Sequence, residues 1–71
     1  MYSVTYQDQT VEYVYSFYTL QDALDFVHTE YLEEENWNHL WEGSLYDRLN
    51  GGEKCVRIAW THQSHVFLEE L

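Results

Sequence analysis

The residues of this chain that could take part in chemistry are its single cysteine and its four histidines. Cys55 could act as a nucleophile if a histidine assisted it. His62 and His65, together with His39 and Cys55, could supply nitrogen and sulfur ligands to a zinc ion. However, the His62–His65 pair lacks the paired cysteines of a zinc finger, and Cys55 falls within a predicted strand. The sequence therefore predicts no catalytic residue, no metal site and no cofactor.

Sequence motifs of common enzyme classes do not occur in the chain. It has no glycine-rich phosphate loop, no G-x-S-x-G elbow and no H-E-x-x-H pattern. A chain of 71 residues also has little room for a ligand pocket of the usual size, about 300–1,000 Å³. We therefore expect a protein that is not an enzyme and that acts by binding.

The acidic residues are the most informative part of the sequence. Thirteen Asp and Glu residues against three Lys and Arg give a formal net charge of −10. Residues 1–47 contain ten of these acidic residues and no Lys or Arg, whereas residues 48–71 contain three residues of each sign. Such a charge repels nucleic acid and anionic membranes and attracts basic partners. An adaptation for solubility would spread along the whole chain, so the asymmetry favours a binding surface.

The composition also indicates a compartment and a folded state. A single cysteine cannot form an intramolecular disulfide, which favours a reducing compartment. The first ten residues resemble no signal peptide, and no apolar run approaches the roughly 20 residues of a membrane span. The aromatic share of 18% exceeds that of disordered chains. We expect a single acidic domain over residues 1–71, located in the cytoplasm.

The first half of the chain has clear periodicity. Apolar and polar residues alternate over residues 2–7 and 11–18, which predicts a β-hairpin over residues 2–18 with a turn at Asp8. Thr19 is a predicted helix N-cap, with Asp22 three residues later in the manner of a capping box. The apolar face of the following helix comprises Leu20, Ala23, Leu24, Val27 and Tyr31. This spacing predicts a helix from Leu20 to about Glu34.

The last third of the chain is ambiguous. Leu45 and Leu49 could lie on a short helix that ends at Gly51. Alternatively, Asn50-Gly51-Gly52 could form the turn of a hairpin between residues 43–49 and 54–60, and we prefer the hairpin. Residues 61–71 form either a short helix or a final edge strand. The predicted fold class is α+β, with element order β-β-α-β-β and one helix packed across an antiparallel sheet.

The predicted helix carries its charges in an unusual arrangement. Asp22, Asp25 and Glu33 share the face opposite the apolar one, and Phe26 lies among them. Phe26 could contact a partner, or it could tuck under the connection that carries the tryptophans at positions 37 and 41. A helix C-terminus prefers Lys or Arg, yet this one ends in three glutamates, which costs stability. A partner that supplies cations would explain this arrangement.

A set of acidic and aromatic residues is therefore the predicted partner-binding site. It comprises Asp22, Asp25, Phe26, Glu30, Glu33, Glu34, Glu35 and Trp37. Carboxylates spaced along a helix can stand where phosphates would, and the aromatic rings can contact surfaces that bases would stack on. The predicted partner is a basic, nucleic-acid-binding protein, and we expect no direct contact with nucleic acid or membrane.

In size, charge and layout the chain resembles the small acidic inhibitors that bacteriophages and mobile elements encode, including DNA-mimic and anti-CRISPR proteins. The carboxylates of the predicted site, together with Tyr31 and Trp37, carry this resemblance. It implies that the protein blocks a nuclease, a CRISPR effector complex, a restriction enzyme or a transcription factor. For a phage-encoded protein it also implies the cytoplasm of the host cell.

A second interpretation is an oligomeric structural or adaptor protein, such as a homodimer. The aromatic residues of the predicted strands are more numerous than one sheet face needs, and a chain of this size gains stability from a dimer interface. They are Tyr13, Tyr15, Phe17, Tyr18 and Trp60. Self-association and salt-dependent binding of a basic partner distinguish the two interpretations.

Overall fold

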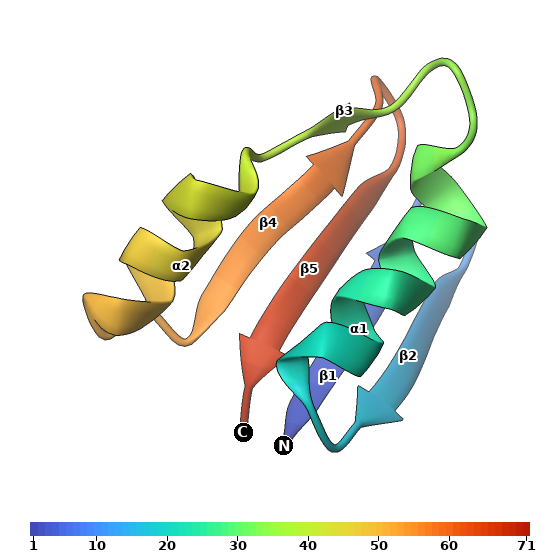
Figure 1. Cartoon of the computed structure of the whole chain (residues 1–71). Helices are drawn as coiled ribbons and strands as arrows, with labels where there is room; N and C mark the ends of the chain where they lie inside the picture. Colours follow the sequence, from blue (N-terminus) through green and yellow to red (C-terminus); the bar gives the residue numbers. More distant parts are fainter.

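The computed structural model describes residues 1–71, and it has two helices on one face of a five-stranded antiparallel sheet (Figure 1). The strands are β1 (Tyr2–Gln7), β2 (Glu12–Phe17), β3 (Asn38–His39), β4 (Cys55–Trp60) and β5 (His65–Glu70). The helices are α1 (Leu20–Val27), which continues as the π-helical turn η1 (His28–Leu32), and α2 (Glu42–Asn50). The sheet order is β2-β1-β5-β4-β3. The predicted α+β class with an antiparallel sheet is confirmed, with two helices in place of one. Neither helix is long and apolar enough to cross a membrane.

The predicted N-terminal hairpin is present. β1 and β2 pair in the register that places Tyr6 opposite Tyr13 and Val4 opposite Tyr15. Asp8 organises the turn, because its Oδ1 accepts hydrogen bonds from the backbone N–H groups of Thr10 (2.8 Å) and of the next residue (2.9 Å). An Asp side chain that bonds to the backbone two and three residues later is a standard turn-forming device.

The first helix begins at Leu20, as the sequence predicts, and it ends at Leu32, two residues before the predicted end at about Glu34. The Thr19 hydroxyl accepts a hydrogen bond from the Asp22 backbone N–H (3.1 Å), which confirms the N-cap. From His28 the backbone widens into the π-helical turn, whose C-cap is Glu33. Glu34 and Glu35 therefore lie outside the helix. The wider turn places both Tyr31 and Leu32 against the core.

The preferred hairpin between residues 43–49 and 54–60 is wrong, because residues 42–50 form helix α2. The two glycines end this helix instead of turning a hairpin. The Gly52 N–H donates to the Leu49 carbonyl (3.1 Å), and the Glu53 N–H donates to the Arg48 carbonyl (3.1 Å). These two bonds form a Schellman motif, which needs a left-handed residue, and Gly52 has φ +98°. The alternative helix was the correct interpretation.

The last segment is a strand, but it is not an edge strand. β5 lies between β1 and β4 in the middle of the sheet. Its inward side chains, Val66 and Leu68, are fully buried, which explains why this apolar segment takes a central position. In β4 the register shifts between Arg57 and Ala59, which marks a β-bulge. Because of this bulge, the Trp60 side chain lies on the same sheet face as Arg57, whereas strict alternation predicts the opposite face.

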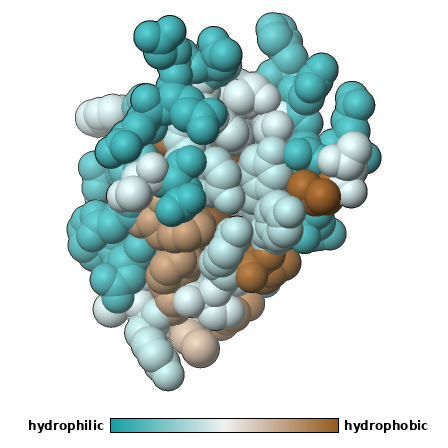
Figure 2. Space-filling view, turned by 90° about the vertical axis from the view of Figure 1, so that its right-hand side faces the viewer, coloured by the Kyte–Doolittle hydropathy of each residue, from teal (hydrophilic) through white to brown (hydrophobic).

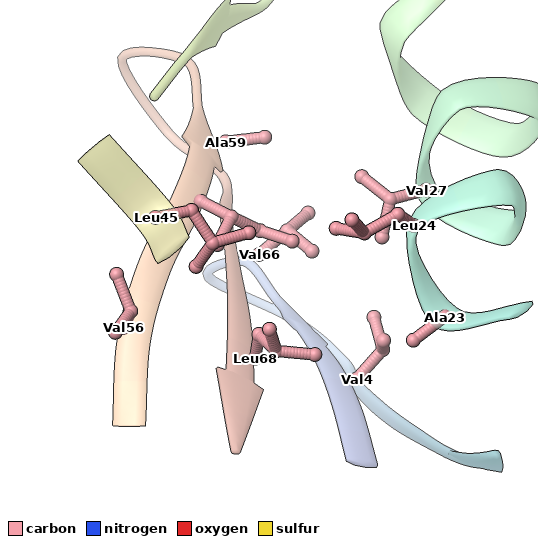
Figure 3. Close-up of a cluster of buried hydrophobic side chains, with 10 residues drawn as sticks. Val4, Ala23, Leu24, Val27, Leu45, Val56, Ala59, Val66 and Leu68 are labelled. Atoms are coloured by element: carbon pink, nitrogen blue, oxygen red, sulfur yellow. The ribbon is translucent and has the colours of Figure 1, made fainter. Parts of the chain in front are cut away.

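The core lies between the helices and one sheet face (Figure 3). It consists of Val4, Ala23, Leu24, Val27, Leu45, Val56, Ile58, Ala59, Val66 and Leu68. No helix covers the opposite face of the sheet (Figure 1). The β1–β2 turn, residues 33–37 and the β4–β5 turn all lie at the end of the sheet that is opposite to the chain termini.

Candidate partner-binding site

The carboxylates of the predicted site are all exposed, and none of them forms an ion pair. Asp22, Asp25, Glu30, Glu33, Glu34 and Glu35 lie on α1, on η1 and in the connection that follows. The chain has one salt bridge, between Arg48 and Glu53 (3.9 Å), and both of its side chains are about half exposed. Among the six, only Asp25 accepts a side-chain hydrogen bond, from the Gln21 amide (2.8 Å). Their negative charges are therefore uncompensated within the chain.

Phe26 is not an exposed ring among carboxylates, and it does not lie under the connection with the tryptophans. It is half-buried and packs on strand β2, with ring centroids 4.5 Å from Tyr15 and 5.2 Å from Phe17. On a helix that lies across the sheet, position 26 faces the neighbouring strand β2 instead of solvent. Its role as a partner contact remains a prediction, but the structure gives it a packing role.

Three of the predicted residues, Glu30, Glu34 and Trp37, line one groove of about 350 Å³. The groove lies between the β1–β2 hairpin and the end of the π-helical turn. Its other lining residues are Tyr6, Asp8, Val11, Tyr13, Tyr15 and Tyr31, and none of the nine is basic. We call this set the aromatic groove. Figure 2 views the side that carries α1 and β2, where hydrophilic residues lie in the upper and left parts and paler and apolar ones in the centre and lower part.

Tyrosine rings stack along the aromatic groove. The rings of Tyr6 and Tyr31 are nearly parallel (5°), with centroids 5.2 Å apart, and Tyr13 stacks on Tyr6 at 6.1 Å. Trp37 tilts against both Tyr31 (5.4 Å) and Tyr6 (6.4 Å). Offset and tilted arrangements at these distances are favourable for aromatic pairs. The stack joins the hairpin, the π-helical turn and the connection into one surface.

Asp8 fixes one side of this surface. Its Oδ2 accepts a hydrogen bond from the Tyr6 hydroxyl (2.7 Å). The backbone N–H of Thr10, the Tyr6 hydroxyl and the backbone N–H of Val11 all hold the pKa of the Asp8 carboxyl well below its ordinary value of 3.8. Asp8 is therefore ionised at neutral pH and has a structural role in the turn as well as a place at the groove.

The negative environment also changes the tyrosines. Burial, followed by the neighbouring Tyr15 and Tyr6 and the charge of Glu30, raises the pKa of Tyr31 far above its ordinary value. A hydrogen bond with Ser64 lowers the pKa of Tyr6, but the hydrogen bond to Asp8, burial and the Asp8 charge together raise it. Both phenols stay neutral, because the surroundings disfavour additional negative charge.

The remaining predicted residues are not brought into the groove. Asp22, Asp25, Glu33 and Glu35 do not line it. Trp41, the second tryptophan of the acidic segment, is 73% exposed and borders a separate cleft of about 210 Å³ between α1 and α2. A Cβ atom at Gly43 would lie 2.6 Å from the Trp41 ring, so the glycine provides the space for this ring beside α2.

The residues with potential for chemistry are dispersed. No group of three or more His, Cys, Asp or Glu side chains is placed to hold a metal ion. The Cys55 thiol is exposed at the start of β4. His65 lies on the uncovered sheet face, where its Nδ1 is 3.5 Å from an Arg57 nitrogen.

Sequence reasoning missed the hairpin side of the groove. Tyr6, Tyr13 and Tyr15 share one face by strand alternation, so the sequence held a signal that these three side chains lie together. It held no signal that this face meets Glu30 and Trp37, because that contact depends on how η1 crosses β1.

The chain is a small α+β protein with a groove lined by acidic and aromatic residues. No protein-family model matches the sequence, and comparisons with curated proteins and with solved structures gave no match.

Proposed function

We propose that this protein is a non-catalytic acidic module that binds and blocks a basic, nucleic-acid-binding surface of another protein. One observation carries the proposal: the exposed carboxylates of α1, η1 and the following connection have no basic partner within the chain. They lie beside the aromatic groove, which offers contact area for a bound surface.

The charge and the rings have separate roles in this proposal. Uncompensated surface charge speeds the encounter with a partner of opposite sign and makes the association rate sensitive to salt. Aromatic side chains at an interface contribute most of the binding energy once water is excluded. Carboxylates near Trp37 and Tyr31 would thus guide the partner to rings that hold it.

The class of target follows from the charge. Proteins that bind nucleic acid carry Lys and Arg clusters that contact phosphates, and these clusters suit an acidic surface equally well. A nuclease, a CRISPR effector complex, a restriction enzyme or a transcription factor would present one. We place the protein in the cytoplasm, because its exposed cysteine thiol suits a reducing compartment. If a phage encodes it, this is the cytoplasm of the host cell.

Self-association is the second candidate function, and the sheet edge favours it. β2 has a strand partner on one side only, and its Val14 and Tyr13 side chains are 62% and 51% exposed. Such an edge can pair with another chain. A sedimentation measurement on the purified protein distinguishes a dimer from a monomer.

The test of the acidic module is a capture experiment with two charge-matched variants. The first variant carries Glu30→Lys, Glu33→Lys and Glu34→Lys. The control carries Asp47→Lys, Glu53→Lys and Glu69→Lys, three exposed positions on α2, in the α2–β4 turn and on β5. Since each reversal adds two charges, both variants change the net charge from −10 to −4.

The proposal predicts that the wild-type protein and the control capture basic, nucleic-acid-binding proteins from a lysate at low salt, and that duplex DNA releases them. The first variant should lose this capture, and the wild type should lose it at high salt. Equal capture by the first variant would contradict the proposal and favour the self-association candidate.

A further inference from the structure

We propose that the aromatic groove binds an arginine side chain of the partner protein. This inference rests on the proposed function and assigns to the groove the specific chemistry that it recognises. The groove combines stacked rings with unpaired carboxylates, and its lining contains no Lys, Arg or His.

The size of the groove suits a side chain. Its volume of about 350 Å³ is near the lower end of the range for ligand sites, about 300–1,000 Å³. A single long side chain from a partner surface can enter such a groove, whereas a folded element cannot. Half-buried Tyr6, Tyr31 and Trp37 form its walls, and Tyr13 at its edge is 51% exposed.

The rings favour a cation. The face of an aromatic ring is negative, so a positive group within about 6 Å of the centroid is attracted to it, and arginine is found in this position more often than lysine. The protein itself contains one such contact, because the Arg57 guanidinium lies 4.6 Å from the Trp60 ring centroid on the other face of the sheet. The rings of the aromatic groove have no such partner within the chain.

The carboxylates divide into a structural one and two free ones. Asp8 already accepts hydrogen bonds from Tyr6, Thr10 and Val11, so its oxygens are occupied by the turn. The side chains of Glu30 and Glu34 accept none and form no ion pair; the carboxylates that accept hydrogen bonds are those of Asp8, Asp25 and Glu42. Glu30 and Glu34 are therefore the acceptors available to an incoming cation.

A guanidinium fits the rings and carboxylates of the aromatic groove better than an ammonium does. It is planar, stacks on aromatic faces and presents five N–H donors in a fixed fork that matches carboxylates. A lysine ammonium is a compact and strongly hydrated charge that cannot stack in this way.

The test uses N-acetyl-arginine amide as the probe and the indole N–H signals of the three tryptophans in NMR spectra. Only Trp37 lines the groove, so Trp41 and Trp60 serve as internal references. We expect a saturable shift of the Trp37 signal with a Kd on the order of 1 mM. N-acetyl-lysine amide and tetramethylammonium should bind at least about threefold more weakly.

Two variants test the two halves of the site. Glu30→Gln with Glu34→Gln should raise the Kd of the arginine probe about tenfold, whereas the charge-matched pair Asp47→Asn with Glu53→Gln should leave it unchanged. Tyr13→Ala, at a position that is 51% exposed, should raise the Kd about fivefold, and Trp41→Ala should not change it.

The arginine site is overturned if the Trp37 signal does not shift, if lysine or tetramethylammonium binds as tightly, or if the Glu30 and Glu34 substitutions have no effect. These outcomes leave the acidic module itself to be judged by the capture experiment. Conversely, a saturable arginine site together with unchanged capture by the charge-reversed protein would support this inference and contradict the proposed function.

Discussion

Reversing Glu30, Glu33 and Glu34 to lysine should leave the fold intact and raise its melting temperature. The structure gives these side chains no hydrogen bond and no ion pair, so the substitutions remove no polar contact. All three are exposed, and none belongs to the core. What changes is the interaction of their charges with the end of the helix.

The magnitude follows from the position of the helix end. η1 ends at Leu32 with Glu33 as its C-cap, and no basic residue lies in its last turn. A charge of favourable sign at a helix end contributes about 0.3–1 kcal/mol at low ionic strength, and exposed side chains lie at the lower limit. Three reversals therefore amount to about 1 kcal/mol. In a domain of 60–100 residues this raises the melting temperature by about 4–8 °C.

The assay is a thermal melt of the wild type and both charge-reversed variants at low salt and at 1 M salt. The control with Asp47, Glu53 and Glu69 reversed shares the relief of overall charge repulsion and leaves the end of η1 unchanged. At the end of α2 it has two opposing effects, because it removes a last-turn carboxylate and also the Arg48–Glu53 ion pair. We expect the variant with Glu30, Glu33 and Glu34 reversed to melt above the control at low salt and near it at 1 M, where the Debye length is about 3 Å. A melting temperature below that of the wild type would refute the reasoning, because the glutamates would then have stabilising partners that the structure lacks.

Two further changes test local features of the fold. Gly52→Ala should cost about 1–2 kcal/mol in a urea titration, because φ is +98° and no neighbour limits the space around a new Cβ, so the cost is conformational; Gly52→Asn should cost less, and equal losses would contradict the left-handed cap. Asp8 has a folded-state pKa below its ordinary value of 3.8, so its contribution to stability is complete above this pH and is lost as the pH falls below it. Asp8→Asn should therefore lose less stability between pH 6 and pH 3 than the wild type does, and identical losses would show that the carboxylate is not linked to folding.

The elements that the sequence predicted correctly depend on neighbours within one element. Strand alternation places Tyr6 and Tyr13 on one face, and the Thr19 cap is a contact over three residues. Such local signals do not depend on how the rest of the chain folds. They identified the hairpin and the start of α1 without any knowledge of the sheet order.

The elements that the sequence did not predict depend on distant partners. A Gly-Gly pair serves a Schellman motif and a hairpin turn equally well, so residues 44–53 could not be assigned from local signals. Tertiary contacts decide the outcome: Leu45 is buried in the core, and β3 already pairs with the end of β4 at Ala59 and Trp60. The central position of β5 has the same origin: β4 precedes it in a local hairpin, but its other neighbour, β1, comes from the opposite end of the sequence.

Some residues of the candidate site could be predicted from the sequence, and others could not. Glu30, Glu34 and Trp37 were predicted from the order of charges and rings along the chain, and the structure places all three at the groove. Asp8 was predicted only as a turn residue, and Tyr6 only as a strand residue. The stacking of Tyr6 on Tyr31 depends on the π-helical turn, and the hydrophobic pattern of the sequence did not indicate that the helix widens there.

The proximity of like charges and large rings can now be explained in physical terms. The buried residues of α1 are Ala23, Leu24 and Val27, all of which precede the glutamates, so the domain can hold unfavourable charges at the helix end without losing its packing. The Tyr31 and Tyr6 rings beside those charges stay neutral: burial is the main cause of the raised pKa of Tyr31, and, against the lowering effect of Ser64, a hydrogen bond to Asp8 and burial raise the pKa of Tyr6. A cation that enters this environment meets ring faces and free carboxylates together, and it reduces the repulsion that the helix end bears when unbound. On the proposed function, binding and relief of this repulsion are the same event, which is why charge reversal should stabilise the free protein and weaken its complex.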